Sequence, residues 1–305
     1  MTKHNAIPEL FTSFPRQTII ADGSSVYDFL GGSVKGEYKF GWDKNCPSSG
    51  REITPPFPGL NEWTIDWVAC LLAAKLAKDC FRVIELGAGY GHWAVASVLA
   101  FKSISPKRPA SVFAVEADKT HFNWLEENIQ TNLGRFHDVS SDLRHAAAGL
   151  DGVISFPFLT NPAEDYGASY NNSQSERFIE VPCYSLSTVF RNIGNERANL
   201  LHCDIQGAEA DLIAQPGFGG SMKHVDVALF GTHRSDDLHN QVVDTLINCG
   251  FRIAVEWPRN SAIETTYGQL QTNDGAVLAI HSDLFGQANR LTEFEHLQGK
   301  VVEPI

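Results

Sequence analysis

Short apolar runs alternate with amphipathic or alanine-rich runs along most of this chain, a pattern that predicts strands alternating with helices. The expected strands lie at residues 82–86, 111–116, 142–148, 200–205, 225–232, 251–257 and 276–281. The expected helices lie at residues 61–78, after residue 91, at 119–131 and at 237–249. Strands and helices in this alternation pack as an open sheet covered on both faces. The chain is therefore predicted to have an α/β fold.

Composition divides the chain into three segments. Residues 1–60 are rich in glycine, proline and aromatics, with strand pieces expected at 18–21 and 38–42 and a proline-rich stretch that forbids a helix. We expect an N-terminal extension there, either a lid over the site or an arm packed on the domain edge. Residues 61–285 carry the alternating pattern and form the predicted domain, and residues 286–305 form a polar C-terminal tail.

The net charge of the chain limits the kinds of molecule that it is expected to bind. A net charge of −12 and a pI near 5.3 argue against nucleic acid and anionic membranes, which bind through Lys and Arg. No signal-peptide pattern and no run of about 20 apolar residues is found. The six cysteines include no C-x-x-C pair, and four of them are expected to be buried thiols: Cys70, Cys80, Cys203 and Cys249. These features predict a reduced, cytoplasmic protein.

A glycine-rich turn follows the first strand of the domain. Gly87, Gly89 and Gly91 stand between that strand and an alanine-rich helix, where glycines let backbone N–H groups approach a ligand. The dinucleotide fingerprint requires its third glycine at the position of His92, so the spacing disfavours a nicotinamide cofactor. With the acidic Glu85 before it, E-L-G-A-G-Y-G resembles the S-adenosylmethionine (SAM) loop of class I methyltransferases. A tight turn without a ligand is the alternative.

The next two strands end on polar groups. Glu116 ends the second strand, where a carboxylate can accept both hydroxyl protons of a ribose. Asp118 is expected to cap the following helix. His145 and Ala146 lie at the end of the third strand, beside the position of an adenine in this topology. Glu116 could instead be a surface carboxylate, and His145 a hydrogen-bonded histidine at the sheet margin.

Further candidates follow the fourth and fifth strands. In L-L-H-C-D-I-Q-G-A-E, Asp204 is expected near the sulfonium and Gln206 as a hydrogen-bonding partner. His233, at the end of the fifth strand, is the expected general base, because its ordinary pKa is near 6.5. The polar loop 161–177 is either functional or disordered, and its Tyr166 and Tyr170 would suit a substrate surface.

Together these motifs resemble those of the FkbM-type SAM-dependent methyltransferases. D-I-Q-G-A-E-A-D is similar to their K-I-D-V-E-G-A-E, and the order of motifs over residues 80–255 is also similar. The resemblance implies a Rossmann-like class I methyltransferase fold, a seven-stranded, mostly parallel sheet flanked by helices. It also implies methyl transfer to a hydroxyl oxygen of a natural-product scaffold or a sugar. Gln206 stands where the family often has glutamate, which weakens the assignment of a base.

The expected function is SAM-dependent O-methyl transfer to a small-molecule or carbohydrate acceptor, by a candidate homodimer. The catalytic candidates are His233 and Asp204, and the substrate candidates are Tyr166, Tyr170 and His233. The candidates for binding SAM are Glu85, Gly87, Ala88, Gly89, Gly91, Glu116, Ala117, His145, Ala146, Asp204 and Gln206. Three alternatives stay open: a divalent cation held by Asp204, Glu209 or His233, a nicotinamide-dependent oxidoreductase, and a SAM-binding protein without activity.

Overall fold

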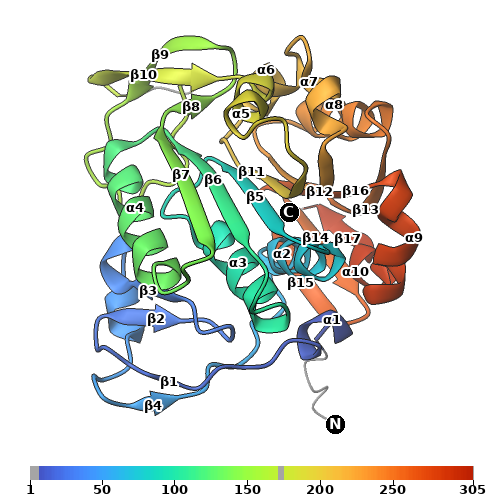
Figure 1. The fold of residues 1–305 in the computed structure, drawn as a ribbon. Helices are drawn as coiled ribbons and strands as arrows, with labels where there is room; N and C mark the ends of the chain where they lie inside the picture. Colours follow the sequence, from blue (N-terminus) through green and yellow to red (C-terminus); the bar gives the residue numbers. More distant parts are fainter. Residues whose placement is uncertain (1–6, 171–174, 305) are drawn as a thin grey trace.

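The computed structural model describes residues 7–170 and 175–304. Its central sheet holds, in spatial order, β13 (Phe251–Trp257), β16 (Gly275–His281), β12 (Val225–Thr232), β11 (Ala198–Cys203), β5 (Phe81–Leu86), β6 (Ala110–Glu116) and β7 (Val139–His145) (Figure 1). β16 is antiparallel to both of its neighbours, and every other neighbouring pair is parallel. The seven-stranded, mostly parallel sheet of the Rossmann-like class I methyltransferase fold is therefore confirmed.

Helices cover both faces of this sheet, because successive side chains of each strand point to opposite faces. Val83 belongs to the hydrophobic core on one face and its neighbour Ile84 to the core on the other. The first core includes residues of α1 (Glu9–Thr12), α2 (Thr64–Leu76), α3 (His92–Ile104), α4 (Lys119–Leu133), α9 (Ser282–Leu291) and α10 (Phe294–Gln298). The second core is covered by α5 (Leu186–Asn192), α6 (Glu209–Ile213), α7 (Phe218–Met222) and α8 (Asp236–Asn248).

The parallel register brings the ends of three strands to one edge. Leu86, the last residue of β5, pairs with Val115 on one side and with Cys203 on the other. Asp118 caps α4 as expected, since its side chain accepts hydrogen bonds from the N–H groups of Thr120 and His121. The turns that follow β5, β6 and β11 consequently meet at the carboxyl edge of the sheet, where open α/β sheets bind their ligands.

The N-terminal segment forms two short antiparallel strand pairs and two 3₁₀ turns. The paired strands are β1 (Ile19–Ile20) with β4 (Glu52–Ile53) and β2 (Ser25–Tyr27) with β3 (Ser33–Lys35), and the turns are η1 (Gly36–Tyr38) and η2 (Trp42–Asn45). The strand expected at 38–42 is wrong, because Gly41 has a φ of 79° and breaks the extended backbone there. Leu10, Phe11 and Phe29 of this segment are buried in the first core.

Two further small sheets lie outside the central one. β8 (Ala147–Ala148), β10 (Phe178–Tyr184) and β9 (Gly152–Pro157) form the first, next to the site described below. The second joins β15 (Gly268–Thr272), β14 (Ser261–Thr265) and the C-terminal β17 (Lys300–Pro304). The tail boundary expected at residue 286 falls inside α9, and the residues after it are packed, with the indole Nε1 of Trp257 donating to the carbonyl of Leu297 at 3.0 Å.

The observed burial differs from expectation at three side chains. Cys70 and Cys203 are buried as expected, but Cys80 is exposed and Cys249 only partly buried. Trp63 falls within the helix predicted at residues 61–78, but it precedes α2 and is 44% exposed. Over the part of the chain that the structure describes, no helix combines the length and hydrophobicity that crossing a membrane requires.

Candidate functional site

A cavity of about 240 Å³ lies at the carboxyl edge of the central sheet. Nine of the residues expected to bind SAM line it: Glu85, Gly87, Ala88, Gly89, Glu116, Ala117, Ala146, Asp204 and Gln206. Tyr166 and Tyr170 line it as well. Three other candidates, Gly91, His145 and His233, are not among the lining residues. Residues chosen from four separate stretches of sequence are thus brought together around one cavity.

The glycine turn is shaped by its contact with the neighbouring strand. Gly87 has a φ of 75°, and a Cβ atom there would lie 1.9 Å from the carbonyl oxygen of Asp204. Gly91 also has a φ of 75°, but it precedes α3 and packs against Leu125, so its role is structural. Gly87 therefore allows the close approach of the β5 and β11 turns.

Glu85 accepts a hydrogen bond from the N–H of Ala94 at 2.9 Å, and burial raises the pKa of its carboxyl to about 7.

Glu116 is held in place by two backbone donors. Its oxygens accept hydrogen bonds from the N–H groups of Gly89 and Asp118, each at 2.7 Å. Burial raises its pKa, although the two N–H groups and His121 act in the opposite direction. A carboxylate fixed in this way keeps free lone pairs for further donors.

His145 does not line the cavity but packs beside residues that follow β6. Its Nε2 lies 3.0 Å from the carbonyl oxygen of Ala117, and its ring packs on Phe122. This geometry matches the alternative expectation, in which His145 is a hydrogen-bonded histidine at the margin of the sheet. The adjacent Ala146 lines the cavity in its place.

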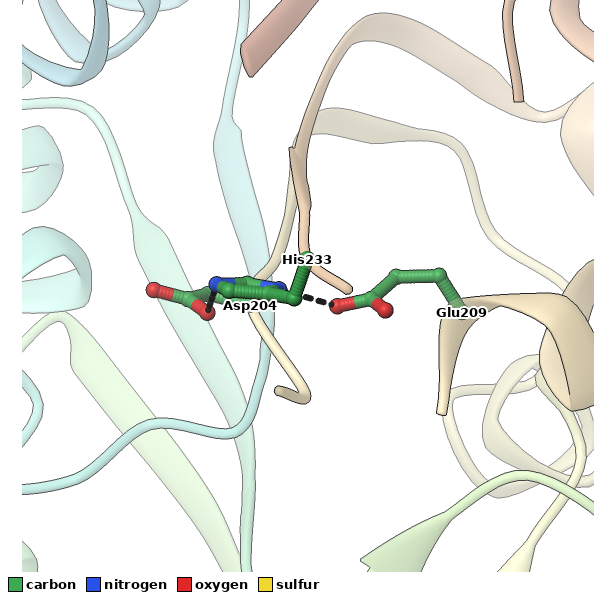
Figure 2. Close-up of side chains that lie close together, drawn as sticks. All are labelled: Asp204, Glu209 and His233. Carbon is green, nitrogen blue, oxygen red and sulfur yellow. Dashed lines mark hydrogen bonds and ion pairs between the residues drawn. The ribbon is translucent and has the colours of Figure 1, made fainter. Parts of the chain in front are cut away.

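A chain of ion pairs stands behind one wall of the cavity. Figure 2 shows the imidazole of His233 between two carboxylates. Its Nδ1 lies 3.0 Å from Oε1 of Glu209, and its Nε2 lies 3.2 Å from Oδ1 of Asp204. Gln206 donates from its amide nitrogen to the same Asp204 oxygen at 2.8 Å. Only Asp204 and Gln206 of this cluster reach the cavity.

These contacts determine the charge of the imidazole. Burial alone would lower the pKa of His233, but the carboxylates of Asp204 and Glu209 outweigh it and raise that pKa to about 11. His233 in turn lowers the pKa of Asp204 against the effect of burial. At neutral pH the ring carries both protons, so it has no lone pair with which to accept a third. The geometry therefore disfavours the role of general base that we expect for His233.

The same three side chains are the candidates for holding a metal ion. Asp204, Glu209 and His233 offer ligand atoms within 4.8 Å of one another, the one such group found in the described residues. In the observed geometry, each imidazole nitrogen is directed at a different carboxylate. A cation would have to displace a proton from the ring before binding, since a metal ligand must be neutral imidazole. We interpret the cluster as a chain of ion pairs.

The two tyrosines of loop 161–177 have hydroxyls that are already hydrogen-bonded. Tyr166 donates to the carbonyl of Tyr38, and its ring stacks on His121 at 4.3 Å between centroids. Tyr170 donates to the carboxylate of Asp211 at 2.8 Å. They can thus present ring surface to a ligand, and Tyr166 joins the loop to the N-terminal segment.

Sequence reasoning missed several lining residues. Among them is His202, whose Nε2 lies 2.9 Å from Oδ1 of Asp66 on α2. Its Nδ1 is buried and has no hydrogen-bond partner among the described residues. Also missed were Lys39, Trp42, Trp63, Trp67, Tyr90, His92 and Trp93. His202 lies in β11, two residues before Asp204, so strand alternation was a signal that could have identified it.

The ion-pair chain predicts a pH dependence of stability. Because the pKa of His233 rises on folding from about 6.5 to about 11, its contribution is complete below pH 6.5 and is lost as the pH approaches 11. The difference in unfolding free energy between wild type and His233→Asn should shrink over this window. The exposed His137→Asn serves as the control variant. Denaturant titrations across the window test this, and NMR titration of the imidazole tests it without a variant. A ring that becomes neutral near pH 6.5 would contradict the assignment.

Comparison with known proteins agrees with the geometry. The family model described as the Methyltransferase FkbM domain matches residues 87–253, which is more than half of the 305 residues. A protein of Jannaschia sp. (strain CCS1) named "Putative methyltransferase" is 28% identical over 216 residues, covering 67% of this chain and 74% of that protein.

Solved structures that are similar to this chain include two methyltransferases. The FkbM methyltransferase of Methylobacillus flagellatus KT is 14% identical with a TM-score of 0.41, covering 67% of this chain and 45% of that one. The precorrin-6y C5,15-methyltransferase of Geobacter metallireducens GS-15 is 12% identical with a TM-score of 0.37, covering 70% of this chain and 85% of that one. The assignment follows from the domain match alone: this chain belongs to the FkbM methyltransferase family.

Proposed function

We propose that this protein transfers a methyl group from SAM to a hydroxyl oxygen of a small molecule. The observation that carries the proposal is the fixed carboxylate of Glu116, which lines a cavity beside the Gly87–Gly89 turn. Membership of the FkbM family supports methyl transfer as the reaction. SAM would supply the methyl group, on a positively charged sulfur that needs no further activation.

The residues around the cavity fit the chemical groups of SAM. Glu116 can accept hydrogen bonds from a ribose, and the small side chains of Ala117, Ala146 and Ala147 leave room for a flat base beside it. These groups give the nucleoside end of the cofactor a place at the ends of β6 and β7. The nicotinamide alternative gains no such support from the turn, since its third glycine is missing.

Glu85 and His202 fit the amino-acid end of the cofactor. They are paired in the register of β5 and β11, so their side chains stand side by side on one face of the sheet. Burial opposes a charge on His202, but Asp66 and Glu85 outweigh it and raise the pKa of the imidazole. Its unpartnered Nδ1–H can then donate to a carboxylate, while Glu85 can accept from an ammonium group. We infer that this pair holds the amino-acid end.

Asp204 is the proposed contact for the acceptor hydroxyl. It lies at the end of β11 and lines the cavity, and His233 keeps it ionised by lowering its pKa. Ionised carboxylates accept hydrogen bonds, so Asp204 can orient the hydroxyl and take up its proton as the oxygen attacks the methyl group. His233 then acts as a positioning residue, since it fixes Asp204 and lies behind the cavity wall.

A metal-assisted reaction is the second candidate, on the observation that Asp204, Glu209 and His233 are clustered. If the cluster is an ion-pair chain, a chelator of divalent cations should leave the rate of methyl transfer unchanged. The measurement is turnover of labelled SAM after dialysis against chelator, with a mock-dialysed control. A rate that falls and is restored by Mg²⁺ would instead favour the metal-assisted reaction.

Binding of SAM tests the role of Glu116. Glu116→Gln replaces a charged acceptor of two hydrogen bonds with an amide, which should raise the dissociation constant for SAM by roughly tenfold to hundredfold, the usual worth of a charge-assisted hydrogen bond. The matched control is Glu126→Gln, on the exposed side of α4. Calorimetry with SAM gives both constants. Equal affinity of the two variants would exclude Glu116 as the ribose ligand.

Turnover tests the role of Asp204. Asp204→Asn should lower kcat by about 10²–10⁴-fold while SAM still binds, because a group that positions a hydroxyl and accepts its proton contributes this much. Asp274→Asn is the control: Asp274 lies 3.9 Å from the same imidazole, is largely exposed and does not line the cavity. Single-turnover transfer from labelled SAM measures both. Similar rates for the two variants would remove Asp204 from the mechanism.

A further inference from the structure

The part of the cavity that the cofactor residues leave free has aromatic walls. We call it the aromatic chamber, and define it by Lys39, Trp42, Trp63, Trp67, Tyr90 and Trp93. Its residues come from the N-terminal segment, from α2 and the residue before it, and from the glycine turn and the start of α3. Since SAM is assigned to the turns after β5, β6 and β11, the chamber is a part of the cavity that is open to the methyl acceptor. This inference therefore rests on the proposed function.

The rings of the chamber form a connected wall. Trp67 and Trp93 meet edge to face, with centroids 5.4 Å apart, and Trp42 meets Tyr90 at 6.5 Å. His92, between them, is buried, and burial lowers its pKa to about 4, so its ring is neutral. Rings arranged in this way offer both faces and edges to a flat, unsaturated ring.

Lys39 is the one cationic side chain among the six residues that define the chamber. The ammonium of Lys39 lies 4.6 Å from the ring centre of Trp63 and 5.3 Å from that of Trp42. No ion pair within 4.0 Å joins Lys39 to a carboxylate among residues 7–170 and 175–304. Burial lowers its pKa, which Glu62 partly offsets from a greater distance. An ammonium without an ion-pair partner at the wall of a binding cavity is suited to an anionic group on the ligand.

The basicity of the side chains near the acceptor limits which hydroxyl groups they can deprotonate. Glu85 and Glu116, whose pKa values are raised, are assigned to the cofactor, which leaves Asp204 and His92 near the acceptor. The pKa of Asp204 is lowered, and that of the neutral His92 lies near 4, so both are weak bases. A weak base removes a proton efficiently only from an acidic hydroxyl. A phenol has a pKa of about 10, whereas water, like an aliphatic alcohol, is several units less acidic at about 15.7. This chemistry favours a phenolic acceptor over the hydroxyl of a sugar.

We propose that the acceptor is an aromatic acid with a phenolic hydroxyl. Its ring lies against the tryptophans of the chamber, its carboxylate pairs with Lys39, and its hydroxyl meets Asp204. In the reaction the phenolic oxygen forms a bond to the methyl carbon as the carbon–sulfur bond breaks. The electron pair of that bond stays on sulfur, which leaves as S-adenosylhomocysteine (SAH), and the phenolic proton passes to Asp204 and then to water.

The test compares 4-hydroxycinnamate with its neutral amide, 4-hydroxycinnamamide, on the full chain loaded with SAH. Quenching of tryptophan fluorescence and calorimetry measure binding. The acid should bind roughly tenfold to hundredfold more tightly than the amide, since a charge-assisted contact is worth this ratio. Lys39→Met should remove the difference, and Lys39→Arg should keep most of it. With labelled SAM, the methyl group should be found on the phenolic oxygen.

The outcomes separate this inference from the proposed function. If SAH itself does not bind, the proposed function fails. If SAH binds but the acid and the amide bind equally, or neither binds, the aromatic-acid assignment is wrong. A neutral sugar methylated in preference to both probes would also overturn it. If Lys39→Met lowers only the melting temperature and keeps the acid-to-amide ratio, Lys39 serves merely to hold Trp42 and Trp63 together.

Discussion

The cavity depends on the contact between the turn at Gly87 and the end of β11. The N–H of Asp204 donates to the carbonyl of Leu86 at 3.0 Å, and the N–H of Gly87 donates to the carbonyl of Val115 at 3.0 Å. Three strands are thus joined where they end. Any side chain at position 87 would meet the carbonyl of Asp204, push β11 away and separate Glu116 from Asp204. The distance between the two halves of the site is therefore set by one missing methyl group.

Much of the fold could be predicted from the sequence, because periodicity and local turn chemistry encode it. The apolar runs of β5, β6 and β11 gave their positions to within about two residues, and Asp118 marked the start of α4. Gly87 and Glu116 were found because glycines and acidic residues placed directly after apolar runs indicate where the strands of a parallel sheet end. Such features depend on neighbours in sequence, which is why they can be recognised without the structure.

The remaining features depend on contacts between distant parts of the chain. Trp67 belongs to the helix predicted at residues 61–78, and its periodicity gave no sign that it lines the cavity. Lys39 had no signal at all, since its neighbours Trp42 and Trp63 become meaningful only once the N-terminal segment is folded. His233 was chosen for its ordinary pKa, and only the folded structure places Asp204 and Glu209 on either side of its ring, where they raise that pKa. The hairpin of β14 and β15 was missed, because its alternation is short and polar.

Gln206 has a consequence for the electrostatics of the whole cluster. The two carboxylates of Asp204 and Glu209 and the single imidazolium of His233 sum to one negative charge, and the amide of Gln206 adds none. A sulfonium arriving beside Asp204 would bring this sum to zero. Glutamate at position 206 would leave an excess anion there instead, and it would lose the amide donor to Asp204. The departure from the family pattern thus leaves this cluster with one negative charge fewer than a glutamate at position 206 would give it.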